Sequence, residues 1–396
     1  MRTVQRRRSR PSRARRPGSA LLLWFSYTSL AASCSSPLHM RSAQDAGRAC
    51  PNGWTSCDGT CVDTQTESNN CGGCGSVCTA VSPSTAQCAA GRCLVTLAAG
   101  QPFPSDIAVN DAYVYWVNQG TADNNYADGA VMRVLLAGGT PTALASGQPH
   151  ASGVALDATN VYWTRAGTTD ADGAVMRMPL DGGSPMTLAS EQPSPGPIVA
   201  DVTSVYWGNA GTSNAYYKDG SVMKLALGDG TLTTLVGGGL PDDIVVDAMS
   251  VYWTNFENAV PGPIMKVPIS GGVPVVLATA TSSPLSIAID ATSVYWTSGH
   301  DGTVMMVPCA GGPPTTLASA QAYPVGVAVD STSVYWTNEG TGANNLMDGS
   351  VMKIALGGDT LTTLAVDRNG PSRMAIDPTS VYWTGHDGTI MKLSPK

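Results

Sequence analysis

Short apolar stretches separated by turn residues fill residues 94–396, and they return in the same order seven times. In each unit the first stretch ends in Asp or Asn, the second reads Val-Tyr-Trp, the third contains Met, and the fourth reads Thr-Leu-Ala or similar. The tryptophans of the second stretch lie 40 to 47 residues apart: Trp116, Trp163, Trp207, Trp253, Trp296, Trp336 and Trp383. Because three apolar residues follow one another without alternation, we expect this strand to be covered on both faces.

The turns between the stretches fit tight antiparallel connections. Segments such as Asp330–Ser333 begin with a carboxylate that can accept backbone N–H groups in a turn. Gly-Gly pairs such as residues 138–139 supply the positive φ that a hairpin needs. Seven units of four short strands predict the blades of a β-propeller.

The fourth stretch follows only six of the seven units, at residues 141–145, 185–189, 231–235, 274–278, 314–318 and 361–365. A counterpart for the seventh unit stands before the first, "LVTLA" at Leu94–Ala98. The sequence therefore predicts an all-β fold, a seven-bladed β-propeller of four-stranded blades over residues 94–396. An N-terminal outer strand closes it, and a small disulfide-rich module precedes it.

The phrase "VYWTN…DGSVMKIAL" resembles the YWTD-type propellers of low-density-lipoprotein receptors, and the resemblance covers residues 94–396. Strand order and the Tyr-Trp-Thr core agree with that family. Two features differ: the receptor propellers have six blades, and the Asp that follows their Thr is replaced here, for example by Asn338.

Residues 1–33 are typical of an export signal, with eight Arg, no acidic residue and an apolar core at Leu21–Ala32 that is too short to span a membrane. The segment "AASC" resembles the lipobox of bacterial lipoproteins, which implies lipidation of Cys34. Ordinary signal-peptidase cleavage near Ala31–Ser33 is the alternative. Residues 34–49 are small and polar, and we expect a tether. The protein is thus expected in the cell envelope, anchored at the outer membrane or cell surface, or secreted.

Eight cysteines fall within residues 50–93: Cys50, Cys57, Cys61, Cys71, Cys74, Cys78, Cys88 and Cys93. In an exported chain they predict four disulfides, whose pairing is one of 105 possibilities. Zinc is the alternative, because "CGGC" has the spacing of metal ligands. The pattern resembles the stigma-specific Cys-rich family, which implies a small extracellular module without a catalytic role.

The charge is uneven along the chain. Beyond residue 33 there are 14 basic and 29 acidic residues, a net charge of −15. Such a surface repels phosphate backbones, so nucleic acid is excluded as a partner. The only membrane contact expected is through the lipid anchor.

Signatures of catalysis are absent from the sequence, which has no Gly-x-Ser-x-Gly elbow, no His-Glu-x-x-His motif and no phosphate loop. Cys309 stands where other units have Leu or Ile, so we interpret it as a core residue. His300 and His386, both in "GHDGT", are interpreted as turn residues, with an acid–base pair as the alternative.

In each unit, one residue stands four positions before the Asp or Asn that ends the first strand. We expect these residues to line the mouth of the central channel. These residues are Asp106, Gly153, Pro197, Asp243, Ser286, Gly326 and Arg373. Two separated Asp and one Arg do not match the acidic metal site of gluconolactonase-like propellers, and we expect a salt bridge between Arg373 and the neighbouring Asp106. The strand-ending aspartates are interpreted as turn caps, and the basic residues after Met as solvated or locally paired.

Three loops between second and third strands share an extended length: Gly120–Gly129, Gly211–Gly220 and Gly340–Gly349. Because the first three units are adjacent, we expect their loops to form a wall on one side of the face that carries them, with amide, carboxylate and aromatic contacts for a ligand. The candidate ligand-binding residues are Asn124, Asn125, Tyr126, Asn214, Tyr216, Tyr217, Asp170 and Asp172. Calcium is a weaker alternative, and long tolerated loops without a ligand are another.

These observations favour an exported, lipid-anchored binding or scaffold protein that is monomeric, needs no cofactor and binds protein or glycan at the cell surface. The alternative is a propeller hydrolase or lyase, lactonase-like, with a divalent metal in the central channel.

Overall fold

The computed structural model describes residues 50–169, 172–215, 218–256, 262–279, 284–342, 347–366 and 369–396. The predicted signal peptide, Cys34 and the tether therefore lie outside the described residues. Among the described residues, no helix is long and apolar enough to cross a membrane.

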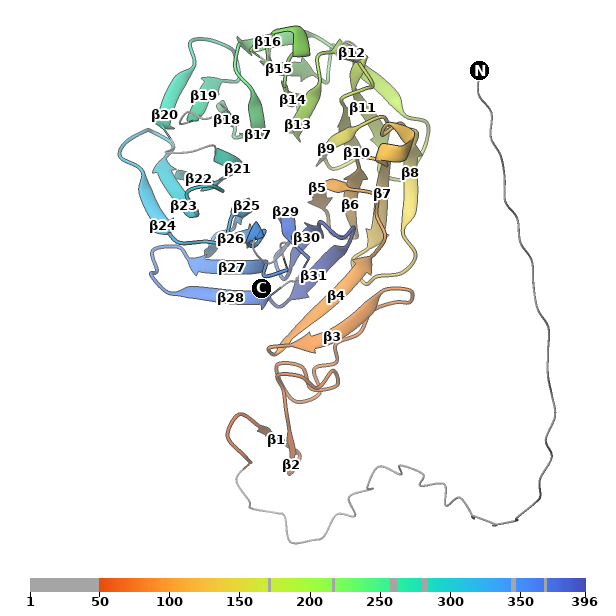
Figure 1. Ribbon diagram of the computed structural model, residues 1–396, viewed down its shortest axis with the longest axis vertical. Coiled ribbons are helices and arrows are strands. Elements are labelled where there is room, and N and C mark those ends of the chain that lie inside the picture. The colour runs from red at the N-terminus through yellow and green to blue at the C-terminus, as the bar shows by residue number, and fades with distance from the viewer. Residues whose placement is uncertain are drawn as a thin grey trace, which may run out of the picture. The chain divides into compact units, whose positions relative to one another are not determined.

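Seven sheets are arranged around a central channel, each with its first strand at the channel and its last strand at the rim (Figure 1). Blade 1 contains β5(Pro104–Val109), β6(Tyr113–Asn118), β7(Ala130–Leu135) and β8(Thr142–Ser146). Blade 2 contains β9(Ala151–Leu156), β10(Asn160–Arg165), β11(Gly173–Pro179) and β12(Met186–Gln192). Blade 3 contains β13(Pro195–Ala200), β14(Ser204–Asn209), β15(Ser221–Ala226) and β16(Leu232–Gly237). Blade 4 contains β17(Pro241–Val246), β18(Ser250–Asn255), β19(Pro263–Pro268) and β20(Val275–Thr279).

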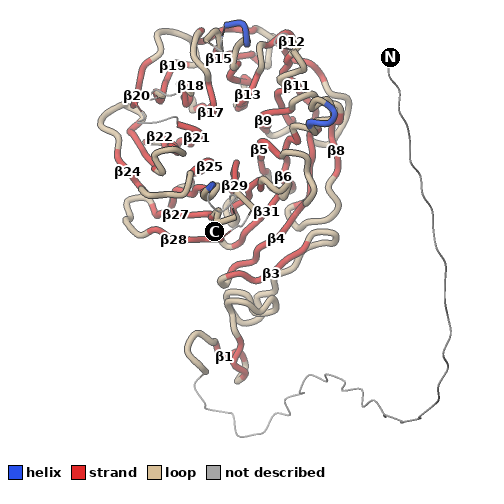
Figure 2. Tube along the Cα trace, in the orientation of Figure 1, coloured by secondary structure: helices blue, strands red, loops and turns tan. Residues whose placement is uncertain are grey.

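Blade 5 contains β21(Pro284–Ile289), β22(Ser293–Ser298), β23(Thr303–Pro308) and β24(Thr315–Ala318), and blade 6 contains β25(Pro324–Val329), β26(Ser333–Asn338), β27(Ser350–Ala355) and β28(Leu361–Val366). Strands make up nearly all of the regular structure (Figure 2). Helix is confined, where the chain is described, to short 3₁₀ turns such as η1(Ala122–Asn124) and η2(Ser213–Ala215). The predicted all-β propeller of seven blades is confirmed.

Blade 7 is closed by a strand from the other end of the chain. It contains β29(Pro371–Ile376), β30(Val381–Gly385) and β31(Ile390–Ser394), and its outer strand is β4(Arg92–Ala98), which pairs with β31 so that Lys392 lies opposite Val95. The predicted closure by Leu94–Ala98 is confirmed. The sheet also has a fifth strand that was not expected, β3(Thr85–Ala89), because β3 and β4 form a hairpin at the end of the Cys-rich region.

The core lies between blades. Each of seven buried clusters contains the Tyr of one Val-Tyr-Trp strand and the Trp of the next blade, for example Tyr115 with Trp163 and, at the closure, Tyr382 with Trp116. Successive strand residues point to opposite faces, so Tyr and Trp of one strand enter different clusters. This arrangement explains why the apolar run does not alternate.

The Thr after Trp ties each blade to the next. The Thr337 hydroxyl accepts a hydrogen bond from the Gly326 N–H at 2.8 Å and donates to the Ser372 carbonyl of the next blade at 2.5 Å. Thr164, Thr254 and Thr297 make the same pair of bonds. Blade 1 has Val117 instead, and there the Ser105 hydroxyl donates to the Ser152 carbonyl at 3.1 Å.

The Cys-rich region holds a short hairpin, β1(Thr55–Cys57) and β2(Thr60–Val62), and four disulfides. They join Cys50 to Cys61, Cys57 to Cys74, Cys71 to Cys88, and Cys78 to Cys93. The prediction of four disulfides is confirmed, and the zinc alternative is wrong. The region also contacts blade 1, where Val81 N–H donates to the Ala137 carbonyl at 2.9 Å.

Candidate functional site

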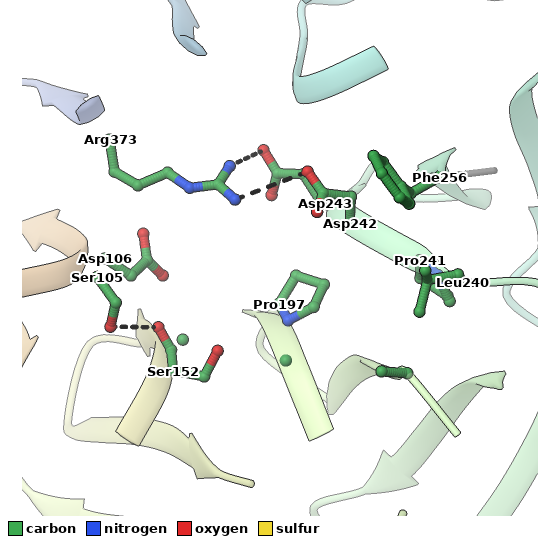
Figure 3. A pocket seen from close by; sticks show the side chains of 13 residues that line it. Ser105, Asp106, Ser152, Pro197, Leu240, Pro241, Asp242, Asp243, Phe256 and Arg373 are labelled. Carbon is green, nitrogen blue, oxygen red and sulfur yellow. Dashed lines mark hydrogen bonds and ion pairs between the residues drawn. The ribbon is translucent and has the colours of Figure 1, made fainter. Parts of the chain in front are cut away.

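A cavity of about 460 Å³ lies at the mouth of the channel, at the ends of the inner strands β5, β9, β13 and β17 (Figure 3). We call it the channel-mouth cavity. Its polar wall carries Asp106, Asp242, Asp243 and Arg373, and its apolar wall includes Pro197, Leu240, Pro241 and Phe256. It opens on the end of the ring that carries the second-to-third-strand loops and the connections between blades, which we call the loop-bearing face.

Arg373 spans the channel. It belongs to blade 7, yet its guanidinium lies 3.4 Å from Asp243 and 3.9 Å from Asp242 in blade 4 (Figure 3). The expected salt bridge with neighbouring Asp106 is not formed, because the long Arg side chain reaches the adjacent pair of carboxylates on the opposite wall. Asp106 and Asp243 also join blades: their carboxylates accept N–H groups of Val154 and Ile287 in the next inner strand, at 2.8 and 3.0 Å.

Three carboxylates and one guanidinium line the channel mouth, and only Asp242 and Asp243 pair with the guanidinium, so the local charge is negative. Burial raises the pKa of Asp106 to about 6, although Arg373 and the Val154 amide act in the opposite direction. Burial likewise raises the pKa of Asp242 to about 6, against the attraction of Arg373. Burial disfavours the charge on Arg373, but Asp243, Asp242 and Asp106 together hold the pKa of Arg373 above its usual value.

The channel mouth does not suit the divalent metal of a lactonase-like enzyme. A guanidinium already lies among the carboxylates, and oxygens of Asp106 and Asp243 are used by backbone amides. Within the described part of the chain, no group of three or more His, Cys, Asp or Glu side chains has a metal-binding arrangement.

The candidate loop residues that the structure describes lie on the loop-bearing face, and several of them have structural partners. Asn124 and Asn125 are exposed, and the Asn124 amide donates to Asp128 at 2.8 Å. Asn214 is exposed in η2. Asp172 accepts N–H groups of Thr168 and Thr169, at 2.9 and 2.7 Å. Tyr216, Tyr217 and Asp170 lie outside the described residues.

Each extended loop is clasped at its base by a Thr–Asp pair. In blade 1 the N–H and hydroxyl of Thr121 both donate to the Asp128 carboxylate at 2.7 Å, and the Thr121 amide is the main reason why the pKa of Asp128 falls to about 2. Thr212 with Asp219 and Thr341 with Asp348 repeat the arrangement. The sequence analysis did not predict this hydrogen bonding of the Asp before Gly. In all three loops the Thr precedes the Asp by seven residues, and this common spacing could have revealed the pair.

Tyr126 is partly buried between two aromatic neighbours, His150 at 4.4 Å and Phe103 at 6.4 Å between ring centroids. All three residues have positive φ, between 49° and 57°, although Gly adopts such a conformation at lower cost. Phe103 is 57% exposed. Ser194 and Tyr323, which stand at the corresponding positions before the first strands of blades 3 and 6, also have positive φ, so this conformation of Phe103 and His150 is a feature of the repeat.

Several alternatives from the sequence are resolved. Each strand-ending Asp caps its turn and accepts the hydroxyl of the Tyr in the next strand, as Asp377 does from Tyr382 at 2.6 Å, so the turn interpretation is confirmed. The basic residues after Met are locally paired: Lys224, Lys266 and Lys392 donate to a carbonyl of the next blade at 3.0 to 3.1 Å. Cys309 is partly buried against the blade 4–5 cluster, and burial raises its pKa.

The two histidines differ. His300 packs edge-on against Tyr323 at 5.4 Å between centroids. His386 lies 2.6 Å from Glu339 of the neighbouring blade, and this hydrogen bond raises the pKa of His386. The Asp387 beside it caps the Thr389 turn instead.

The loop-bearing face is strongly acidic. In the described parts of its loops, connections and strand ends, three basic residues, Arg165, Lys218 and Arg373, stand against twelve acidic ones. The acidic residues are Asp106, Asp123, Asp128, Asp172, Glu191, Asp219, Asp242, Asp243, Asp301, Glu339, Asp348 and Asp387.

No family model and no curated protein sequence matches the chain. Among solved structures, virginiamycin B lyase from Staphylococcus aureus is similar over 76% of this chain and 98% of its own, with 14% identity and a TM-score of 0.59. The WD40 β-propeller domain of Doa1 is similar over 76% and 95%, with 14% identity and a TM-score of 0.58. A chain of a nidogen/laminin complex is 21% identical over 61% of this chain and 91% of its own, with a TM-score of 0.47. The likeness to the first two shows the fold alone.

Proposed function

We propose that this chain is an exported binding protein that uses the loop-bearing face of its propeller to hold a positively charged protein at the cell surface. The excess of carboxylates over basic groups on this face carries the proposal. Complementary charge increases the rate and the specificity of association.

The channel-mouth cavity is the proposed anchor point. It combines three carboxylates and one guanidinium with an apolar wall of Pro197, Leu240 and Phe256. A Lys or Arg side chain of a partner has an apolar stem and a cationic end, which matches both walls. The aromatic group of Phe103, Tyr126 and His150 offers flat contact area nearby on the same face.

The test presents the full chain to surface proteins and to envelope polysaccharides of the cells that produce it. We expect a protein to be retained at low ionic strength and released by 0.5 M NaCl, since ionic contacts are screened (a Debye length of about 3 Å at 1 M). Asp106→Asn with Asp242→Asn should abolish retention. Asp229→Asn with Asp359→Asn, in hairpin turns at the opposite end of the blades, removes the same charge and should leave retention unchanged.

Equal retention by both double variants, or retention of a polysaccharide only, contradicts the proposal. The role of the wall is tested separately by replacing Tyr126, Tyr216 and Tyr217 together with Ser. If this variant folds and still retains the partner protein, the loop tyrosines do not contribute to binding.

The same proposal includes the export route predicted from the sequence: a signal peptide over 1–33, acylation at Cys34, a tether over 34–49, and a disulfide module over 50–93 ahead of the propeller. The four disulfides support an oxidising compartment.

A further inference from the structure

The three carboxylates of the channel-mouth cavity differ in how far their oxygens are already used. A carboxylate can accept about four hydrogen bonds. Asp243 has four donors: the N–H groups of Ile244 and Ile287 at 2.9 and 3.0 Å, the Ser286 hydroxyl at 2.7 Å and the Arg373 guanidinium at 3.4 Å. The charge and the acceptor positions of Asp243 are therefore satisfied within the protein.

Asp106 and Asp242 keep free acceptor positions. Asp106 accepts the N–H groups of Ile107 and Val154, at 2.9 and 2.8 Å, and none of the ion pairs among the described residues involves it. No described residue donates a hydrogen bond to the Asp242 carboxylate, whose one ionic contact there is Arg373 at 3.9 Å. Charges removed from water are normally paired, so both carboxylates favour an incoming cation.

The charge of the cavity fits a ligand with two positive groups. Three carboxylates and one guanidinium are the charged groups of its described lining, which leaves a net charge of −2 when all are ionised. Asp106 belongs to blade 1 and Asp242 to blade 4, and Figure 3 shows them on different sides of the cavity. Two linked cationic groups can therefore reach both carboxylates.

The wall between these two carboxylates is made of short or apolar groups. Blades 2 and 3, which lie between blades 1 and 4 in the ring, contribute Ser152, Gly153, Gly196 and Pro197, and blade 4 adds Pro241. The volume of about 460 Å³ is in the range of small-molecule sites. The cavity thus offers an aliphatic chain a path from one anionic group to the other.

We infer that the channel-mouth cavity binds an aliphatic dication, with one cationic group at Asp106 and the other at Asp242. This chemistry is that of a free diamine, or of two neighbouring basic side chains of a partner protein. The inference rests on the proposed function, whose anchor point is the same cavity, and it adds the need for a second cationic group. Linked contacts reinforce one another, because the second forms at a high effective concentration.

The first test is calorimetric titration of the full chain with free amines at low ionic strength and pH 7.5. Both carboxyl groups, with a pKa of about 6, are then ionised. We expect the best α,ω-diamine, in a series from 1,3-diaminopropane to 1,8-diaminooctane, to bind at least ten-fold more tightly than n-butylammonium. Absence of diamine binding, equal affinities of diamine and n-butylammonium, or an affinity independent of chain length overturns the inference.

Single substitutions separate the two ends of the site. Asp242→Asn breaks no hydrogen bond to a described residue, so this variant should fold, and Asp106→Asn removes the other charge. Each should lower the affinity for the best diamine to that of n-butylammonium. Asp229→Asn with Asp359→Asn, at the opposite end of the blades, should leave the affinity unchanged. A diamine affinity that survives Asp242→Asn, or that falls as far in the control, contradicts the inference.

Competition separates the two sources of the dication. If a basic pair of a partner protein occupies the cavity, a saturating amount of the best diamine should release the retained protein, and n-butylammonium at equal ionic strength should not. Release by n-butylammonium as readily as by the diamine overturns the inference but not the anchor point.

Two outcomes overturn the proposed function alone. A retained protein that the diamine does not release binds outside the cavity, and the ligand of the cavity is then a free diamine. If no protein is retained at low ionic strength, the proposed function is wrong, and the titration still decides whether the cavity binds a dication.

Discussion

Single side chains join neighbouring blades at two levels of this ring. Near the loop-bearing face, Asp106 and Asp243 accept amides of the next inner strand. At the same level, the Thr after Trp bonds both its own blade and the next. Near the opposite face, basic residues such as Lys266 donate to carbonyls of the next blade. Buried polar groups need partners, so each of these side chains is fixed by its neighbours.

The variant Thr337→Val tests the bonds made by the Thr after Trp. It keeps the shape of the side chain but leaves the Gly326 N–H and the Ser372 carbonyl without their partner. We expect a loss of about 2 to 3 kcal/mol in the free energy of unfolding, measured in urea. Thr316→Val, on an exposed outer strand, should change it by less than about 0.5 kcal/mol. Similar losses in both variants contradict the role given to Thr337.

The contribution of Arg373 to the free energy of unfolding is expected to depend on pH, because two neighbouring carboxyl groups have raised pKa values. The pKa of Asp106 and of Asp242 is raised to about 6 in the folded chain, above the ordinary value of 3.8, so the folded state binds more protons than the unfolded state between about pH 4 and 6. The free energy of unfolding from these groups therefore falls as pH rises through this window. Arg373→Met removes the compensating charge, so we expect a loss of about 1 to 3 kcal/mol at pH 7.5 and a clearly smaller loss at pH 4.5.

Urea unfolding at the two pH values provides the measurement, with Arg177→Met as the control, because Arg177 lies on β11 away from the channel. An equal loss for Arg373→Met at both pH values contradicts the interpretation.

At the scale of elements, four consecutive strands form each of the first six blades, and the seventh borrows its outer strand. The count of Val-Tyr-Trp stretches and the position of "LVTLA" were enough to predict this, because strand periodicity and turn residues are local properties. The ion pair between Arg373 and Asp243 could not be predicted from the sequence. The two residues are 130 positions apart, in blades 7 and 4, and only the closed ring brings them together.

Two truncations test the closing strand. Removal of the chain through Cys93 leaves Leu94–Ala98 able to pair with β31, whereas removal through Ala99 opens blade 7 and exposes the cluster around Trp116. Val95, Leu97 and Ala98 are 5%, 1% and 6% exposed, so their loss should cost roughly 5 kcal/mol. We expect the longer truncation to melt far below the shorter one in thermal unfolding. Equal melting temperatures of the two truncations contradict closure by β4.

At the scale of the whole molecule, the number of free thiols among the ten cysteines tests whether Cys34 is acylated. Eight are paired in disulfides and Cys309 is a free thiol. Titration of the mature protein in denaturant should therefore find one thiol if Cys34 is acylated, and two if the signal peptide is cleaved before an unmodified Cys34. Without denaturant Cys309 should react slowly, since burial raises its pKa. Eight further reactive thiols contradict the disulfide framework.

The pairing of β4 with β31 also has a consequence in time. These strands lie about three hundred residues apart in the chain, whereas the strands of every other blade are consecutive. During synthesis from the N-terminus to the C-terminus the first six blades can form as their strands emerge, but the seventh has to await the last strand. Meanwhile the β3–β4 hairpin, complete once Ala98 has been made, exposes the edge that β31 will occupy. Such an edge can bind other extended chains, so the interval before β31 arrives is when this protein most needs a chaperone.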